Sequence, residues 1–242
     1  MTGAGTGMGL AAAKIFHQNG NEVIMVARNG ERLIAESEKL GNGAFYITCD
    51  LSDETQLKNL VENIREKHPD TNMAFLNAGV ATNYNLLGEQ DAFGVSKVEM
   101  STNYHPVVFL TQYLEEIIEQ NSDPIMIVTT SGVAFAPDLL HPTYSATKAA
   151  LHNFLVGLRL VLERKSSAIK LFELMAPLVD SPFSKGVTSD LKVEPEEVIN
   201  IMIKAIESDT YEIRPGLTEE IYQIYLKSPK EALKMVNAAT GY

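Results

Sequence analysis

The sequence has few cysteines, no excess of basic residues and no long apolar run, and each of these absences excludes a class of protein. Cys49 is the only cysteine among 242 residues, so no internal disulfide can form, and we expect a cytoplasmic protein. No apolar segment approaches the roughly 20 residues that span a bilayer, and the first residues do not have the pattern of a secretory signal. A net charge of −11 argues against binding to nucleic acid or an anionic membrane. We expect neither partner.

The composition that remains is typical of one globular α/β domain. The chain is 45% hydrophobic and long enough to bury a large core, and no linker or change in composition divides it. Short apolar strands are predicted at residues 21–27, 44–48, 72–76, 124–130, 169–175 and 211–213. Helices are predicted at residues 8–19, 30–40, 55–67, 98–120, 143–163, 195–207 and 218–237. This alternation predicts a single-domain, doubly wound parallel sheet of the Rossmann type over residues 1–242.

The chain opens on a glycine-rich turn, T-G-x-x-x-G-x-G, from Thr2 to Gly9. Such a turn lets the backbone approach a phosphate and pass it to a helix N-terminus, whose free N–H groups favour negative charge. It requires a buried strand in front of it, and here only Met1 precedes it. Without that central strand, buried backbone groups stay unpaired at roughly 1–3 kcal/mol each. We therefore expect that the first strand is missing from the recorded N-terminus.

Tyr144 and Lys148 are the first candidate catalytic pair. They lie four residues apart in Y-S-A-T-K, so on a helix they share a face. A tyrosine is a poor base at neutral pH because its ordinary pKa is about 10, and a nearby ammonium lowers that pKa by stabilising the phenolate. Ser131 ends a predicted strand, where ligands bind open parallel sheets. The ordinary alternatives are a surface pair and a turn serine beside Gly132.

Three further stretches lie at strand ends or inside a helix. Residues 76–79 read L-N-A-G and close a predicted strand, and Asp50 with Leu51 follows the strand at residues 44–48. Asn103 stands inside a predicted helix although asparagine is a poor helix former. An ordinary turn, a helix cap and an exposed asparagine are the alternative interpretations.

In their order and spacing these residues resemble the short-chain dehydrogenase/reductase family, and the stretch around Tyr144 is most similar to its DltE-like oxidoreductase subgroup. The resemblance covers nearly the whole chain and implies hydride transfer between nicotinamide and a carbonyl or alcohol substrate. It assigns proton transfer to Tyr144, orientation of the substrate oxygen to Ser131, support of Tyr144 and ribose binding to Lys148, and a relay water to Asn103. The cofactor-binding residues that it implies are Thr2, Gly3, Thr6, Gly7, Met8, Arg28, Asp50, Leu51, Asn77, Ala78, Gly79, Tyr144, Lys148, Val179 and Ser181, and it implies no metal.

The residue after the second strand of such a fold distinguishes the two nicotinamide cofactors. An acidic residue there binds the ribose hydroxyls of NAD(H) and repels a 2′-phosphate. Ala27 occupies that place, and the guanidinium of Arg28 suits a phosphate. We therefore expect NADP(H) to be preferred, with NAD(H) possible. Two positions depart from the family pattern: Pro177 replaces a glycine, and Leu76 replaces the first asparagine of N-N-A-G.

Other functions and partners follow less directly. A non-catalytic NADP(H)-binding sensor or scaffold of the same fold is the alternative to an enzyme. Ser131 as a hydrolase nucleophile lacks a G-x-S-x-G elbow, although His141 and His152 lie near Tyr144 in the sequence. Residues 180–217 are expected to form the substrate region. The resemblance implies a homodimer or homotetramer, with Val107, Phe109, Leu151, Phe154 and Leu158 as candidate contacts if they do not simply pack on the sheet.

Overall fold

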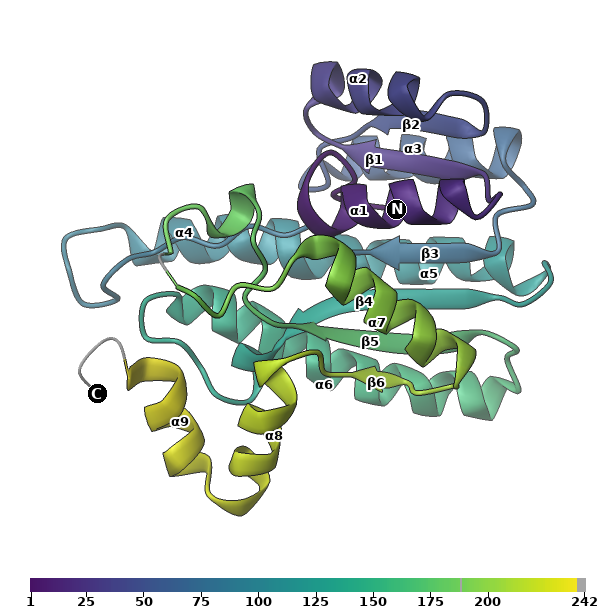
Figure 1. Cartoon of the computed structure of the whole chain (residues 1–242). Helices are drawn as coiled ribbons and strands as arrows, with labels where there is room; N and C mark the ends of the chain where they lie inside the picture. The colour runs from purple at the N-terminus through teal and green to yellow at the C-terminus, as the bar shows by residue number, and fades with distance from the viewer. Residues whose placement is uncertain (188, 239–242) are drawn as a thin grey trace.

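Parallel strands form the middle layer of the molecule, with helices on both faces (Figure 1). The computed structural model describes residues 1–187 and 189–238. Its strands are β1 (Val23–Ala27), β2 (Ala44–Thr48), β3 (Met73–Leu76), β4 (Ile125–Ser131), β5 (Lys170–Ala176) and β6 (Glu212–Ile213). Hydrogen bonds join β1 to β2, and join the others in the order β3–β4–β5–β6, always in parallel. The predicted doubly wound α/β fold is confirmed.

Helices cover the sheet in two groups. The α-helices are α1 (Gly7–Gln18), α2 (Gly30–Leu40), α3 (Glu54–Lys67), α4 (Ala92–Glu99), α5 (His105–Glu119), α6 (Pro142–Lys165), α7 (Pro195–Glu207), α8 (Leu217–Lys227) and α9 (Pro229–Asn237). Helices α1, α2 and α7 pack on one face of the sheet, and α3, α5 and α6 pack on the other. None of the described helices is both long and apolar enough to cross a membrane.

Between β1 and β3 the described chain contributes only its first two residues. Thr2 forms an isolated parallel bridge with Val26 and donates its N–H to the Phe75 carbonyl at 2.9 Å, while Val26 donates to the Met1 carbonyl at 2.8 Å. These bonds join the two sheets at the place where the sequence predicts a central strand. Met1 and Thr2 lead directly into the glycine turn, so β1 on one side and β3 on the other hold the start of that turn.

Two of the residues predicted to form a subunit contact on α5 and α6 are buried inside the molecule. Val107 is 6% exposed and Leu151 is fully buried, and both lie in the core between the helices and the sheet. They therefore cannot form an outer surface. Phe109, Phe154 and Leu158 are only partly buried against that core.

Two predicted helices are interrupted. The helix expected at residues 98–120 is α4 followed by a π-helical turn, η1 (Met100–Tyr104), and then α5. The helix expected at residues 218–237 breaks at Ser228, which caps α9, because Pro229 has no N–H to continue α8. Apolar periodicity alone does not detect a π turn, because the turn inserts one residue without changing polarity.

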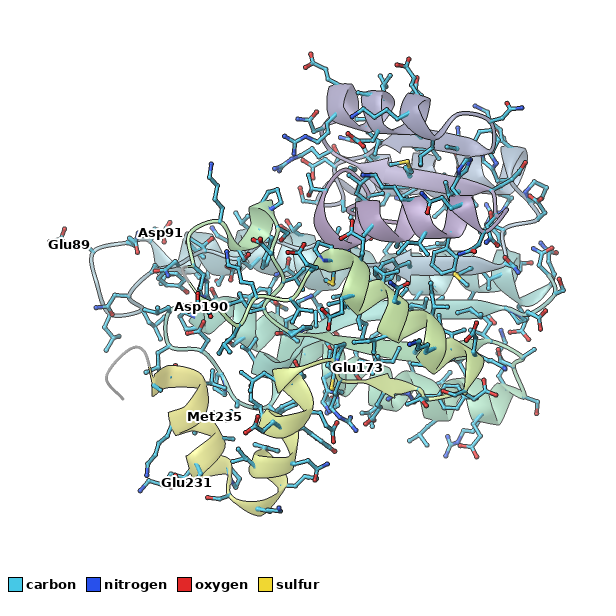
Figure 2. All side chains as sticks on the ribbon, in the orientation of Figure 1. Glu89, Asp91, Glu173, Asp190, Glu231 and Met235 are labelled. Carbon is cyan, nitrogen blue, oxygen red and sulfur yellow. The ribbon has the colours of Figure 1, made fainter. Side chains whose placement is uncertain are left out.

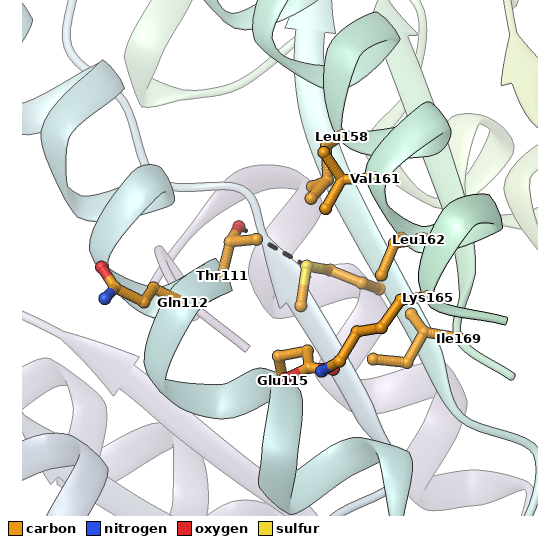
Figure 3. A pocket seen from close by; sticks show the side chains of 9 residues that line it. Thr111, Gln112, Glu115, Leu158, Val161, Leu162, Lys165 and Ile169 are labelled. Carbon is orange, nitrogen blue, oxygen red and sulfur yellow. Dashed lines mark hydrogen bonds and ion pairs between the residues drawn. The ribbon is translucent and has the colours of Figure 1, made fainter. Parts of the chain in front are cut away.

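A cleft of about 200 Å³ opens between α5 and α6 (Figure 3). Its walls include Thr111, whose hydroxyl contacts the Met126 sulfur at 3.5 Å, and an ion pair between Glu115 and Lys165. The predicted catalytic and cofactor residues are not among its lining. The cleft is therefore a feature of the outer helical layer and not of the carboxyl edge of the sheet.

The junction at Thr2 yields a test of stability. Its hydroxyl oxygen accepts the backbone N–H groups of Asn77 at 2.9 Å and Ala78 at 3.1 Å. Thr2→Val keeps the side-chain shape but leaves both N–H groups without this acceptor, so we expect the free energy of unfolding to fall by roughly 1–3 kcal/mol. Urea titration of the variant measures this. Thr2→Ser is the control and should recover most of the loss, and equal stability of Thr2→Val and wild type would contradict the expectation.

Candidate functional site

The glycine turn is shaped by close approaches that a side chain would prevent. A Cβ at Gly9 would lie 2.3 Å from the carbonyl oxygen of Gly3, and Gly3 itself has φ of +68°. The turn leads into α1, which has no acidic residue in its first turn, and Thr6 precedes α1 without a side-chain capping bond. The backbone N–H groups at the start of α1, including that of Met8, therefore meet no competing carboxylate and suit an anion.

Two predicted partners of the turn lie against it. The hydroxyl of Thr2 holds the backbone at Asn77 and Ala78, as described above. A Cβ placed on Gly7 would lie 3.1 Å from the Cβ of Ser181, so the segment after β5 reaches the start of α1. The structure thus brings Thr2, Gly7, Asn77, Ala78 and Ser181 together at one edge of the sheet.

Asn103 lies in the π turn and is fully buried. Its Oδ1 accepts the Val80 N–H at 2.8 Å, and its Nδ2 donates to the Val80 carbonyl at 2.9 Å and to the Thr147 hydroxyl at 3.1 Å. A Cβ on Gly79 would lie 3.3 Å from Asn103 Oδ1 and 3.9 Å from Lys148 Nζ. The alternative of an exposed asparagine is therefore wrong, because this side chain fixes the loop after β3 to α6.

Ser131, Tyr144 and Lys148 meet at the carboxyl end of β4. Ser131 is the last residue of β4, and Tyr144 is in the first turn of α6. The hydroxyl of Ser131 donates to the Ala176 carbonyl at 3.5 Å, and the Nζ of Lys148 lies 5.6 Å from the centroid of the Tyr144 ring. Lys148 is 3% exposed and donates to the Thr129 carbonyl at 2.7 Å. The alternative of a surface pair is therefore wrong.

The direction of the Tyr144 pKa differs from the expectation. Burial raises the pKa of Tyr144 well above its ordinary value, the hydrogen bond from Ser131 opposes that rise, and the charge of Glu99 adds to it. Burial also lowers the pKa of the Lys148 ammonium to about 8, against the opposing charge of Glu173. The lowering of the Tyr144 pKa that the spacing predicts is therefore not seen in this structure.

The predicted adenosine side of the site is more exposed. Arg28 is exposed after β1, and the Asp50 carboxylate accepts the N–H and the hydroxyl of Ser52 at 3.0 and 2.7 Å. The Ser52 hydroxyl bond, more than any other contact, holds the pKa of Asp50 below its usual value. Leu51 is 8% exposed and belongs to the core. The capping alternative holds for this stretch through Asp53, which caps α3, while Asp50 itself is not the cap.

The segment after β5 closes on itself beside Tyr144. Val179 is 7% exposed, bridges Val193 and accepts the Ser184 hydroxyl at 2.6 Å. The ring of Phe183 lies 5.8 Å from that of Tyr144. This segment belongs to the predicted substrate region, of which Thr188 lies outside the described residues. Its contact with Tyr144 gives the site a partly apolar wall.

Sequence reasoning missed two buried carboxylates. Glu99 is fully buried in α4, and its carboxylate accepts the Thr82 N–H at 2.8 Å and the Thr143 hydroxyl at 2.5 Å. Glu173, labelled in Figure 2 on β5, is also fully buried and accepts the Thr130 hydroxyl at 2.6 Å. Nothing in the local sequence around Glu99 indicates its burial, which comes from packing between α4, α6 and the loop after β3. Glu173 did have a signal, because a charged residue stands inside an otherwise apolar strand.

The two histidines near Tyr144 have other partners. His141 Nδ1 lies 2.6 Å from Asp138 Oδ2, and His152 Nδ1 lies 3.0 Å from Glu173 Oε1. The hydrogen bond with Glu173 raises the pKa of His152. Within residues 1–187 and 189–238 neither histidine is hydrogen-bonded to Ser131, which leaves a hydrolase triad without support. The same residues hold no group of three or more His, Cys, Asp or Glu side chains that could bind a metal.

A C-terminal helical hairpin supports the segment between Ser131 and Tyr144. The ring of Phe135 lies 5.2 Å from Tyr222 and 5.6 Å from Tyr225, both on α8. From the end of α9, Asn237 accepts the Leu139 N–H at 2.8 Å and donates to the Pro137 carbonyl at 2.9 Å. In Figure 1 this hairpin lies below the carboxyl end of the sheet. It therefore buttresses one wall of the site from outside the sheet.

Comparison with known proteins agrees with this architecture. A model of the short chain dehydrogenase family matches residues 1–192. An uncharacterized oxidoreductase, DltE of Bacillus subtilis (strain 168), is 31% identical over 181 residues, which are 75% of this chain and 71% of that protein. The chain belongs to the short-chain dehydrogenase family of oxidoreductases.

Solved structures share the fold at low sequence identity. A short chain dehydrogenase from Burkholderia cenocepacia J2315 in complex with NADP has a TM-score of 0.85 at 19% identity, over 97% of this chain and 94% of that one. A short chain dehydrogenase/reductase from Burkholderia phymatum in complex with NAD has a TM-score of 0.83 at 17% identity, over 98% of this chain and 94% of that one. At this identity the two structures support the fold.

The role of the hairpin is testable at Asn237. Asn237→Ala removes the partners of the Leu139 N–H and the Pro137 carbonyl, so we expect the free energy of unfolding to fall by roughly 1–3 kcal/mol. Hydrogen exchange should also accelerate at the Leu139 amide. Lys230→Ala, at an exposed position of the same helix, is the control and should change neither quantity. Unchanged exchange at Leu139 in Asn237→Ala would show that the hairpin does not hold this segment.

Proposed function

We propose that this protein, a single domain over residues 1–242, is a nicotinamide-dependent oxidoreductase that interconverts a carbonyl and an alcohol. The observation that carries the proposal is the meeting of Ser131, Tyr144 and a buried Lys148 at the end of β4, beside the glycine turn. An acid/base phenol, a hydroxyl that can orient an oxygen and a cation are the groups that carbonyl reduction requires from a protein. A non-catalytic sensor would not require all three.

The residues fit a dinucleotide cofactor. The glycine turn leaves room for a backbone approach, and the N–H groups at the start of α1 suit a pyrophosphate. Thr2, Gly3, Thr6, Gly7, Met8, Asp50, Leu51, Asn77, Ala78, Gly79, Val179 and Ser181 would line its path to Tyr144 and Lys148. When bound, the cofactor supplies or accepts the hydride at the carbonyl carbon.

The protein's own part is to handle the proton. In reduction, Tyr144 donates its phenolic proton to the oxygen that receives electrons as hydride reaches the carbonyl carbon, and in oxidation it takes a proton back. Ser131 orients the same oxygen through its hydroxyl. The ammonium of Lys148 stabilises the phenolate that remains. Both polar atoms of the Asn103 side chain already form hydrogen bonds. We therefore propose that this side chain holds the π turn in place, and that the backbone at Asn103 would bind the relay water.

We propose NADP(H) as the preferred cofactor. Arg28 directly follows β1, and no acidic residue stands at the end of this strand. Arg32 lies near the glycine turn, because its Cδ is 3.9 Å from the position that a Cβ on Gly5 would take. Two guanidinium groups on this side suit a 2′-phosphate. One solved neighbour holds NADP and another holds NAD, so either cofactor fits the fold.

We also propose a homodimer or homotetramer through the outer face of α5 and α6. Tyr113, Val156, Leu160 and Val161 are between 42% and 59% exposed there, and Phe109, Phe154 and Leu158 lie beneath them. Exposed apolar side chains that gather on two neighbouring helices are typical of a subunit contact.

Cofactor preference is tested by calorimetric titration with NADPH and then NADH. Arg28→Ala should weaken NADPH binding by about 10- to 100-fold, the equivalent of roughly 1.5–3 kcal/mol for bonds to a charged group, and leave NADH binding unchanged. Arg65→Ala, an exposed arginine on α3, is the control and should change neither affinity. Equal weakening of both cofactors by Arg28→Ala would contradict a role in reading the phosphate.

The proposed reaction is tested with NADPH and a panel of ketones and aldehydes. Tyr144→Phe should lower the turnover rate by roughly 10²- to 10⁴-fold, the contribution of a positioned proton donor, while NADPH still binds. Loss of NADPH absorbance measures turnover. Tyr46→Phe, at an exposed tyrosine on β2, should turn over like wild type. Wild-type protein that binds NADPH and oxidises none of it with any carbonyl would favour the sensor instead.

A further inference from the structure

A fully buried carboxylate stands on β5, outside the proposed proton transfer. Glu173 has no exposed surface, and the strand around it is otherwise apolar. Taking a carboxylate out of water costs several kcal/mol unless hydrogen bonds and an opposite charge compensate. The partners of Glu173 therefore show which elements this charge holds together.

Two side chains bond directly to the Glu173 carboxylate. Thr130 of β4 donates its hydroxyl to Oε1 at 2.6 Å. The Nδ1 of His152, on α6, lies 3.0 Å from Oε1 and 3.1 Å from Oε2. Because an ionised carboxylate only accepts hydrogen bonds, Nδ1 carries a hydrogen and donates it. Glu173 thus joins β4, β5 and α6 at one point.

The nearby arginine does not replace His152. Arg159 Nη2 is 3.7 Å from Glu173 Oε2, and Arg159 Nη1 is 3.6 Å from Glu212 Oε1. Both distances exceed that of a hydrogen bond. The buried Nε of Arg159 has no hydrogen-bond partner among the residues that the structure describes. Arg159 is therefore shared between two carboxylates, and the short contacts of Glu173 on α6 are those of His152.

His152 can gain and lose a proton while it stays bonded to Glu173. Its side chain is 30% exposed, so water reaches the ring, and the described part of the chain offers no hydrogen bond to its Nε2. The charged groups around it are Glu173 on β5, Glu212 on β6, and Lys148 and Arg159 on α6. The hydrogen bond with Glu173 raises the pKa of His152 most, and burial opposes this rise.

The same turn of α6 carries the proposed cation of the site. Lys148 precedes His152 by one helical turn and donates to the Thr129 carbonyl at 2.7 Å. Thr130 follows Thr129, and Ser131 comes next. Two attachments therefore fix this turn of α6 to the end of β4: one from Lys148 to the backbone, and one from His152 through Glu173 to the Thr130 hydroxyl.

We propose that Glu173 and His152 are a positioning pair for the proposed reaction, which holds Lys148 in register with Ser131 most firmly while His152 is protonated on both ring nitrogens. The inference rests on the proposed function and deepens it, because it makes the proton concentration a regulator of that site. Since the pKa of His152 is raised, the stabilisation is complete below the ordinary histidine pKa of about 6.5 and is lost as the pH rises through the raised value.

His152→Gln tests the pair. The glutamine amide can still donate to Glu173 but never carries a charge, so it imitates neutral histidine at every pH. Calorimetric titration with NADP⁺ reads out the position of Lys148, which is proposed to bind the ribose. At pH 6.5 we expect His152→Gln to bind NADP⁺ about 10-fold more weakly than wild type, because a displaced ammonium loses part of its hydrogen bonding. At pH 9 the two affinities should agree within about twofold, because wild-type His152 is then neutral as well.

The matched control is His105→Gln, the same substitution at an exposed position of α5. It should bind NADP⁺ like wild type at both pH values. Equal weakening of His152→Gln at pH 6.5 and pH 9 would overturn the proposal, because a purely structural role does not depend on the protonation of His152. Unchanged binding at pH 6.5 would overturn it too. Wild-type protein that binds no NADP⁺ overturns the proposed function instead.

Two measurements without cofactor keep these failures separate. In protein labelled with ¹³C at histidine Cε1, the signal lost in His152→Gln reports the protonation of His152. Its midpoint should fall by about 1 pH unit in Glu173→Gln, which removes the carboxylate. In urea, wild type should unfold at a higher concentration than His152→Gln at pH 6.5 and at the same concentration at pH 9, and this comparison does not require Glu173→Gln to fold. A urea difference that is the same at both pH values would overturn the inference.

Discussion

The buried ammonium of Lys148 is the constraint on which the site depends. An ammonium at 3% exposure needs a hydrogen bond and a nearby negative charge. The Thr129 carbonyl provides the bond, and Glu173 provides the charge from β5. The Thr129 hydroxyl in turn donates to Asn77 Oδ1, and the Asn77 N–H donates to Thr2. One continuous set of bonds therefore links the glycine turn to α6 through the sheet.

A second network holds the opposite side of Tyr144. The π turn places Asn103 inward, where its amide fills the space between the loop after β3 and Thr147 of α6. Glu99, one turn earlier, fixes the same loop and the first turn of α6. Tyr144 thus lies between two polar networks, one around Lys148 and one around Asn103 and Glu99.

Elements with a strong period or a chemical motif could be predicted from the sequence, while features that depend on long-range packing could not. The strands and the pairing of Tyr144 with Lys148 follow from local patterns, because apolar runs and an i, i+4 spacing fix their own geometry. The π turn at Met100–Tyr104 inserts one residue without changing polarity, and the break at Ser228 depends on a single proline. The expected lowering of the Tyr144 pKa was wrong, because residue spacing predicts a neighbouring lysine but not the burial of the phenol. Burial is the largest cause of the raised pKa.

The proposed proton transfer makes its own electrostatic demand on this site. Burial raises the pKa of the Tyr144 phenol and lowers the pKa of the Lys148 ammonium to about 8, so burial favours the neutral form of both groups. The charge of Glu173 opposes the shift of Lys148, and the Thr129 carbonyl accepts a hydrogen bond from its ammonium. We therefore expect these two partners to matter to the proposed reaction in both directions, because they keep a cation beside the phenol that would give up or take back a proton.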